Sequence, residues 1–248
     1  NFLGDANLPP QYNGELGVEF SIENGISWTQ PTYSDEADFL QHELIKLPNG
    51  NYMGFVITDS NYFVPNSDDY SQIPSVFDFS YEDNIPGWDG SFPYPWTWKS
   101  ERIVEWDEGG NEVWSWNPFH HFSLDDFDYL SEFWEFAAQN NEDFDWTHFN
   151  ALAYNEVDTT IYVSSKNLSR ITKIDRYTGD IIWNLGVPWL GDEVIQPDVL
   201  FSGQHGLQLL ENGNLVFFDN GILSGWFDAN VSGKFKSSVL EIKINENN

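Results

Sequence analysis

Three of the five histidines stand at the same position of a repeated segment. His42 and His205 each follow a Gln and precede an apolar run that ends in Asn-Gly-Asn, and His148 begins a looser third copy. In each copy an Asn follows the His by seven residues. A neutral imidazole exists near pH 7, so histidine can serve as a nucleophile, a general acid–base or a metal ligand. The recurrence favours one shared site over scattered polar residues at strand starts.

The segments around these histidines have the pattern of antiparallel strands. Short apolar or alternating runs are separated by Asn-Gly, Gly-Gly and Thr-Gly turns. After the first two hairpins comes a second pair of strands, at 102–106 with 112–116 and at 169–175 with 180–183, whereas the third copy has only 238–244. Four antiparallel strands per repeat are typical of a β-propeller blade. Residues 17–28 add part of another blade.

We therefore predict an all-β propeller, with residues 1–248 forming a single domain or part of one. Helix is expected only at about 124–138, after Ser123 as N-cap. Because the first strand of each blade lines the central channel, His42, His148 and His205 are expected to converge on the axis. The adjacent pair His120 and His121 has no such periodicity and is interpreted as turn or packing residues.

Composition excludes several classes of protein. Ten Lys and Arg against 40 Asp and Glu leave a net charge of −30, which disfavours nucleic-acid binding. The absence of Cys excludes disulfides and thiolate-ligated metals, and 17% aromatic residues argue against disorder. No apolar run approaches the length of a membrane helix, so no membrane span is expected.

Two metal sites were considered from the residue types. The acidic run 125–145 lacks the spacing of a calcium loop and is interpreted as a solvated acidic helix. The three repeated histidines could bind zinc, as three histidines do in carbonic anhydrase. We predict a site that uses neither a metal ion nor a cofactor.

An aromatic-rich insertion at about 60–100 interrupts the first repeat. It contains 11 aromatic residues and five prolines. Long loops inside compact domains are often functional, so the insertion is either a cap over the channel or a loop folded on itself. In the first case Trp96 and Trp98 would contact a substrate.

At these residues the chain resembles the arylsulfotransferase (aryl-sulfate sulfotransferase) family of six-bladed propellers. The matching segments are the two Gln-His hairpins at 41–51 and 204–214, Asp-Trp-Thr-His-Phe-Asn at 145–150, Ser-Ser-Lys-Asn-Leu-Ser at 164–169 and Tyr-Thr-Gly-Asp-Ile-Ile-Trp-Asn-Leu-Gly at 177–186. The similarity covers roughly residues 40–60 and 100–221. The combination of histidine motifs is more specific than any one of them.

The resemblance implies transfer of a sulfuryl group from a phenolic sulfate ester to a phenol, through a sulfohistidine and without a nucleotide donor. His205 aligns with the family's nucleophile, and His42 and His148 align with its supporting histidines. Lys166 stands where the family has an arginine, and Asn150 is expected to contact the substrate. A local reversal of charge would help an acidic protein admit an anionic ester.

Four of the ten cationic residues lie within 166–176. Lys166 is predicted to hold sulfuryl oxygens, with weaker positioning than an arginine fork would give. Arg170, Lys173 and Arg176 are instead predicted to be solvated strand residues that pair with Asp and Glu of neighbouring blades.

The family is typically exported, so a periplasmic or extracellular location is expected. The partners expected are an aryl sulfate donor and a phenolic acceptor, with further blades supplied by the rest of a longer chain or by a homo-oligomer. Two alternatives use the same propeller. One is a non-catalytic module for binding or surface assembly, and the other is a quinoprotein-like dehydrogenase, suggested by the Thr-Gly turn at 178–179.

Overall fold

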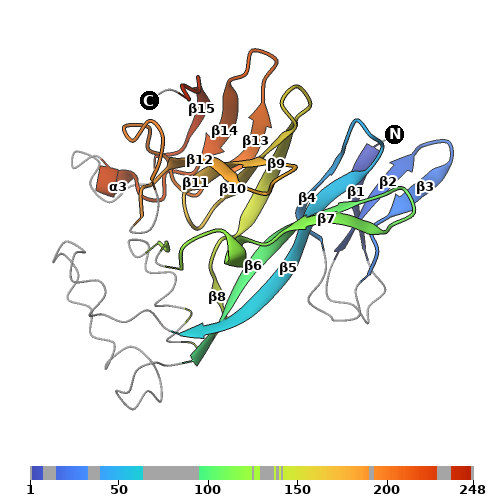
Figure 1. The fold of residues 1–248 in the computed structure, drawn as a ribbon, viewed down its shortest axis with the longest axis horizontal. Helices are drawn as coiled ribbons and strands as arrows, with labels where there is room; N and C mark the ends of the chain where they lie inside the picture. The colour runs from blue at the N-terminus through green and yellow to red at the C-terminus, as the bar shows by residue number, and fades with distance from the viewer. Residues whose placement is uncertain are drawn as a thin grey trace.

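The computed structural model describes residues 2–7, 15–32, 40–63, 95–124, 126–128, 137, 140, 142–189, 193–227 and 236–246. The described chain is all-β, with strands arranged in antiparallel sheets and two short helical segments, η1 (Pro118–His120) and α3 (Ser224–Phe227). Figure 1 shows the sheets following one another along the chain. The prediction of an all-β fold is therefore confirmed.

The first sheet contains the first repeat. Its central path runs through β1 (Phe2–Asn7), β2 (Glu15–Ser21), β4 (Leu40–Lys46), β5 (Tyr52–Phe63), β6 (Pro95–Trp106) and β7 (Glu112–Trp116). Two further strands join its sides, β3 (Gly25–Thr29) on β2 and β8 (Phe144–Asp145), in parallel, on β6. The N-terminal hairpin thus extends the first sheet, because Glu15 pairs with Leu40.

The second and third sheets repeat the same up-and-down order. The second contains β9 (Phe149–Asn155), β10 (Thr160–Ser165), β11 (Arg170–Asp175) and β12 (Ile181–Gly186). The third contains β13 (His205–Leu209), β14 (Leu215–Asp219) and β15 (Ser238–Ile242). Both strand pairs predicted after the first two histidine hairpins, and the single strand predicted after the third, are present.

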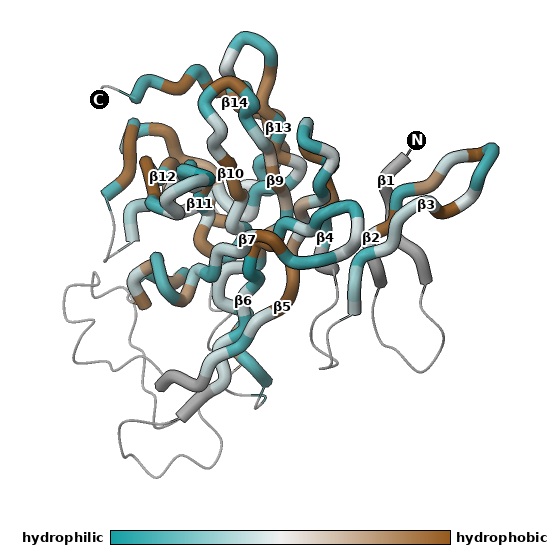
Figure 2. Tube along the Cα trace, turned by 45° about the vertical axis from the view of Figure 1, so that its right-hand side comes forward, coloured by the Kyte–Doolittle hydropathy of each residue, from teal (hydrophilic) through white to brown (hydrophobic). Residues whose placement is uncertain are grey.

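The first strand of each repeat lies beside that of the next, because β9 contacts both β4 and β13. Apolar side chains fill the spaces between the sheets. Phe55 of β5 packs near Phe149 of β9, and Ala151 of β9 belongs to the same buried cluster as Leu207 of β13. In Figure 2 brown, hydrophobic stretches run along the strands, whereas the turns between them are largely teal. None of the described sheets closes on itself, so a complete propeller is not confirmed.

The aromatic-rich insertion predicted at about 60–100 begins later, because strand β5 continues to Phe63. Strands β5 and β6 continue as one antiparallel ladder from the pair Tyr52–Trp106 to the pair Phe63–Pro95. Residues 64–94, and the side chain of Trp96, lie outside the described part of the structure. The cap hypothesis therefore remains a prediction.

Trp98 is a core residue and not an exposed aromatic surface. Its side chain is 2% exposed and meets Phe144 and Trp146 edge-on. Burial of a whole indole stabilises the fold, but it leaves no ring face for a ligand. The prediction that Trp98 contacts substrate is corrected accordingly.

Most of the predicted helix at 124–138 falls outside the described residues; of those described, Ala137 is helical and residues 126–128 are not. Asp126 is instead completely buried and accepts a hydrogen bond from Arg170 at 2.7 Å. The acidic run is therefore not wholly solvated, because a buried carboxylate needs a charged partner.

The other two predicted structural cations are also paired. Lys173 contacts Asp158 and Glu246, and Arg176 contacts Glu105. His121 stacks on Trp116 with 4.5 Å between ring centroids, which agrees with a packing role.

Candidate active site

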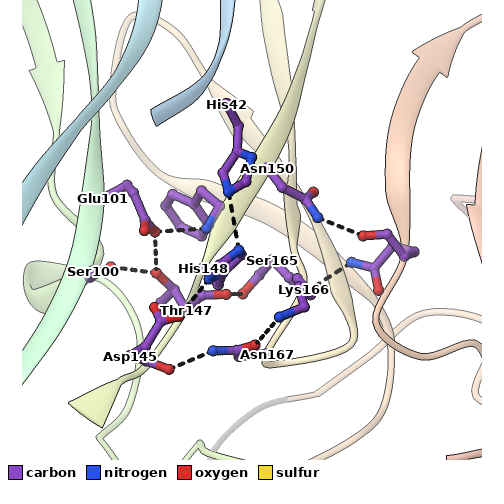
Figure 3. Close-up of polar contacts among 12 residues, drawn as sticks. His42, Ser100, Glu101, Asp145, Thr147, His148, Asn150, Ser165, Lys166 and Asn167 are labelled. Carbon is purple, nitrogen blue, oxygen red and sulfur yellow. Dashed lines mark hydrogen bonds and ion pairs between the residues drawn. The ribbon is translucent and has the colours of Figure 1, made fainter. Parts of the chain in front are cut away.

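His42 and His148 meet where the first two sheets adjoin. The two Nε2 atoms are 3.1 Å apart, a hydrogen bond in which one ring donates and the other accepts (Figure 3). His42 lies in β4 and His148 immediately precedes β9, so two repeats contribute to the contact. The sequence prediction that repeated histidines come together is confirmed for this pair.

Asp145 holds the other nitrogen of His148. Its Oδ2 lies 2.5 Å from His148 Nδ1, so Nδ1–H donates to the carboxylate. With Nδ1 protonated, Nε2 of a neutral His148 carries the lone pair and accepts from His42 Nε2–H. The three side chains thus form a chain of hydrogen bonds in which each donor is defined by the one before it.

Both histidines occupy an uncommon backbone conformation. The φ angles of His42 and His148 are 64° and 50°, in the left-handed region that a residue with a Cβ enters at a cost of about 1 kcal/mol. Strand pairing is irregular at the same place in the repeat, between Leu40 and Leu44 in β4 and between His205 and Gln208 in β13. Such bulges redirect side chains next to functional sites.

His205 is the first residue of β13, and its ring is held through Nδ1. Its Nδ1 lies 2.9 Å from the carbonyl oxygen of Gly203 and 2.8 Å from Asn220 Nδ2, and that amide also donates to the Gly203 carbonyl at 2.5 Å. Nδ1 can either donate to the Gly203 carbonyl or accept from Asn220 Nδ2–H, but not both. When it donates to Gly203, Nε2 is left with a lone pair. This is the tautomer that a nucleophile requires.

Glycine is needed at position 203. Its φ is +61°, and a Cβ would lie 2.2 Å from Ile222 Cδ1. The turn that presents a carbonyl to His205 therefore depends on the absence of a side chain.

Lys166 is the first residue of the turn between β10 and β11. Its backbone N–H donates to the carbonyl of His148 at 3.1 Å, which fixes the lysine beside the histidine segment. Its Nζ donates to Asn167 Oδ1 at 3.3 Å, and Asn167 Nδ2 donates to the Asp145 carbonyl at 2.6 Å. The ammonium group is thus placed close to the histidines.

Asn150 joins the second repeat to the third. It is 7% exposed, and its Nδ2 donates to the backbone carbonyl of Gln204 at 2.7 Å. Its Oδ1 is buried without a hydrogen-bond partner among the described residues. Asn150 therefore positions the residue before His205, and its predicted contact with substrate remains a prediction.

The three histidines and Lys166 influence one another's ionisation. Burial lowers the pKa of His42, and positive charges on His148, His205 and Lys166 lower it further. Burial also lowers the pKa of His205, again with contributions from Lys166 and His148. Both rings are consequently neutral at pH 7, as nucleophilic and basic groups must be.

Glu101 is a buried acid beneath the His148 segment. Its Oε2 accepts from the Phe149 N–H at 2.7 Å and from Thr147 Oγ1 at 3.1 Å. Burial, with a smaller effect of the negative charge on Asp145, raises the pKa of Glu101 from 4.5 to about 7. The folded chain therefore holds a proton here at pH values where an unfolded chain has lost it.

This proton makes stability depend on pH. Between pH 4.5 and about 7 the folded state binds more protons than the unfolded state, so the free energy of unfolding falls as pH rises. Glu101→Gln should flatten this part of the profile by on the order of 2 kcal/mol. Urea titrations of both proteins at pH 5 and pH 8 measure the difference. Equal pH slopes in the two proteins would contradict the assignment.

Comparisons with known proteins agree with these motifs. The family model described as Arylsulfotransferase (ASST) matches residues 97–248, which is more than half of the chain. The chain belongs to the arylsulfotransferase family. The matched region includes His148, Lys166 and His205, whereas His42 precedes it.

Among solved structures, the chain matches a protein of unknown function from Bacteroides caccae. The identity is 10%, the TM-score is 0.32, and the match covers 82% of this chain and 64% of the other chain. The chain thus spans less than two thirds of the length of that protein. No curated protein matches.

Two further observations concern the described part of the chain. None of its helices has the length and apolar character that a membrane crossing requires. It also contains no group of three or more His, Cys, Asp or Glu placed to hold a metal ion.

Sequence reasoning missed three residues of the cluster. Asp145 is the first residue of the 145–150 motif, but its role depends on a turn that folds His148 back toward it. Glu101 and Asn220 come from strand β6 and from the end of β14, and neither belongs to a quoted motif. The one available signal was the i, i+3 spacing of Asp145 and His148.

Proposed function

We propose that this chain is an aryl-sulfate sulfotransferase that transfers a sulfuryl group by a ping-pong route. The observation that carries the proposal is the cluster of His42, His148, His205 and Lys166, which four separate parts of the chain bring together. Family membership supports the class of reaction. The three sheets are proposed as blades of a larger propeller, and their adjacent first strands support this.

His205 is the proposed nucleophile. Its Nε2 attacks the sulfur of the aryl sulfate, the bond from sulfur to the phenolic oxygen breaks, and a phenol leaves after protonation. A phenolic acceptor then attacks the sulfur of the sulfohistidine, loses its proton and releases Nε2. The lowered pKa of His205 supports this role, because the attacking ring must be neutral.

The other members of the cluster serve the transferred group. Sulfuryl transfer spreads negative charge over three oxygens, which the Lys166 ammonium and histidine N–H groups would stabilise. His42 would exchange protons with the phenols, since a neutral imidazole can act as general base and its conjugate acid as general acid. Export to the periplasm or beyond is part of the proposal, as are further blades from a longer chain or a homo-oligomer.

Intact mass spectrometry tests the proposal. The protein is incubated with excess 4-nitrophenyl sulfate and no acceptor, and then with added phenol. A sulfuryl adduct that disappears when phenol is added supports the ping-pong route. A protein that binds the ester without forming an adduct or releasing nitrophenol would instead be a non-catalytic binding propeller.

Exchange of Lys166 provides a second test. Lys166→Arg should raise kcat on the order of tenfold, because guanidinium contacts two oxygens at once. Lys166→Met should lower kcat about 100-fold, since it removes the charge from the site. Steady-state release of nitrophenol measures both effects. Lys243→Arg, at an exposed position, is the matched control and should leave kcat unchanged. Equal rates in all four proteins would refute a role for Lys166.

A further inference from the structure

The segment that carries His148 begins with Asp145, whose carboxylate has no role in the sulfuryl transfer proposed for the cluster. Asp145 Oδ2 lies 2.5 Å from His148 Nδ1, and the His148 Nε2 atom lies 3.1 Å from that of His42. We propose that Asp145 is a positioning residue that fixes the tautomer of His148 and makes His148 the final acceptor of the proton that His42 takes from the phenol. This inference rests on the proposed function.

Asp145 is held firmly in place. It belongs to β8, which pairs in parallel with β6 through Lys99, and the neighbouring Trp146 N–H donates to the Lys99 carbonyl at 2.8 Å. Asn167 Nδ2 donates to the Asp145 carbonyl at 2.6 Å. Two elements therefore fix the backbone from which the carboxylate reaches the histidine.

The histidine is folded back onto this carboxylate. His148 has a left-handed backbone, with φ of 50°, and its side chain forms a hydrogen bond with that of Asp145, three positions earlier. Glu101 accepts from the following N–H, of Phe149, at 2.7 Å, and the Thr147 carbonyl accepts from Ser165 Oγ at 2.7 Å. Strain in the left-handed region persists only where surrounding bonds enforce it, which is the case here.

The order of donors defines the proton path. His148 Nδ1–H donates to Asp145, so the His148 Nε2 lone pair accepts from His42 Nε2–H, and His42 Nδ1 carries the free lone pair of that ring. When the acceptor's O–H bond breaks, its proton binds His42 Nδ1. The Nε2 proton of His42 then moves to His148 Nε2. The result is a neutral His42 and a His148 imidazolium paired with the Asp145 carboxylate, with no net change in atoms or electrons.

Several charged groups surround His148, and they differ in sign. Asp145 and Glu101 are the acidic groups near it, whereas His42, His205 and Lys166 are basic. Asp145 is the carboxylate in direct contact with the ring. Its replacement should therefore have a larger effect on transfer than a change at any more distant charge.

The test uses Asp145→Asn with Asp143→Asn as matched control. Asp143 lies two residues away and pairs with Lys99 through two exposed side chains, so the control removes the same charge without touching His148. In Asp145→Asn we expect kcat for transfer to phenol to fall about 100-fold or more, with KM within about threefold. Adduct formation from 4-nitrophenyl sulfate should change much less, because nitrophenolate leaves without protonation.

A spectroscopic measurement makes the inference independent of activity. Nitrogen-15 NMR of the histidines should show His148 as the Nδ1–H tautomer in the wild type and in Asp143→Asn. In Asp145→Asn this preference should be lost. The pH–rate profile of transfer is compared with that of Glu101→Gln, so that ionisation of Glu101 is separated from that of the dyad.

Each outcome decides one of the two ideas. An Nε2–H tautomer of His148 in the wild type, or transfer by Asp145→Asn as fast as by Asp143→Asn, overturns the role of Asp145. A wild type that forms no sulfuryl adduct overturns the proposed function. In that case the NMR result alone decides whether Asp145 sets the tautomer of His148.

Discussion

Replacement of His205 by Ala should abolish both the sulfuryl adduct and turnover. The variant lacks the nitrogen that accepts the sulfuryl group, so no partial reaction remains for the other residues to assist. Loss of a nucleophile from a cooperating set typically lowers kcat by about 10⁴-fold or more. Intact mass after incubation with 4-nitrophenyl sulfate, and nitrophenol release over hours, measure the two effects.

The structure offers a control with the same chemical change. His120 is exposed at the end of η1 and does not belong to the cluster, so His120→Ala should retain kcat within about threefold. Circular dichroism of both variants checks that they remain folded. An adduct that persists in His205→Ala would place the nucleophile elsewhere, and mass mapping of the modified peptide would then identify it.

The second large effect concerns stability and involves the pair of Arg170 and Asp126. Both side chains are completely buried, and the guanidinium contacts the carboxylate at 2.7 Å. Arg170→Met should lower the free energy of unfolding by about 3–5 kcal/mol, because it leaves a buried carboxylate without its cation. For a chain of this length that corresponds to a melting temperature lower by about 10 °C.

A surface pair provides the comparison. Lys99→Met breaks the ion pair with Asp143, whose side chains are about half exposed, and should cost less than about 1 kcal/mol. The double variant Arg170→Met with Asp126→Leu should recover much of the loss, since it removes both charges. Urea denaturation of the four proteins measures these differences. A small loss in Arg170→Met alone would show that the buried pair contributes little.

The repeat was the part of the fold that sequence could predict. Strands β9 to β12 follow from turns at 155–160 and 176–180 and from the apolar runs between them, because local pairing in an up-and-down order needs no distant information. The position of the N-terminal hairpin of β1 and β2 was harder to predict. Its place in the first sheet depends on the pairing of Glu15 with Leu40, across a segment that carries no turn motif.

The candidate site was predictable where a residue type recurred at one repeat position. His42 and His148 satisfy that condition and form a hydrogen bond. Trp98 was assigned wrongly because composition identifies an aromatic side chain but not the side of the strand on which it lies. Glu101, three residues farther along the same strand, was missed because a single carboxylate in an acidic chain carries no distinguishing pattern.

The hydrogen bond between His42 and His148 joins residues 106 positions apart, and the one from Asn150 to Gln204 spans 54. Closing such distances costs chain entropy before the contacts stabilise anything, so these bonds form after the hairpins within each sheet. During refolding from denaturant, the far-ultraviolet circular dichroism of the strands should recover before enzymatic activity does. Activity then reports the last step of folding, the docking of one sheet against the next.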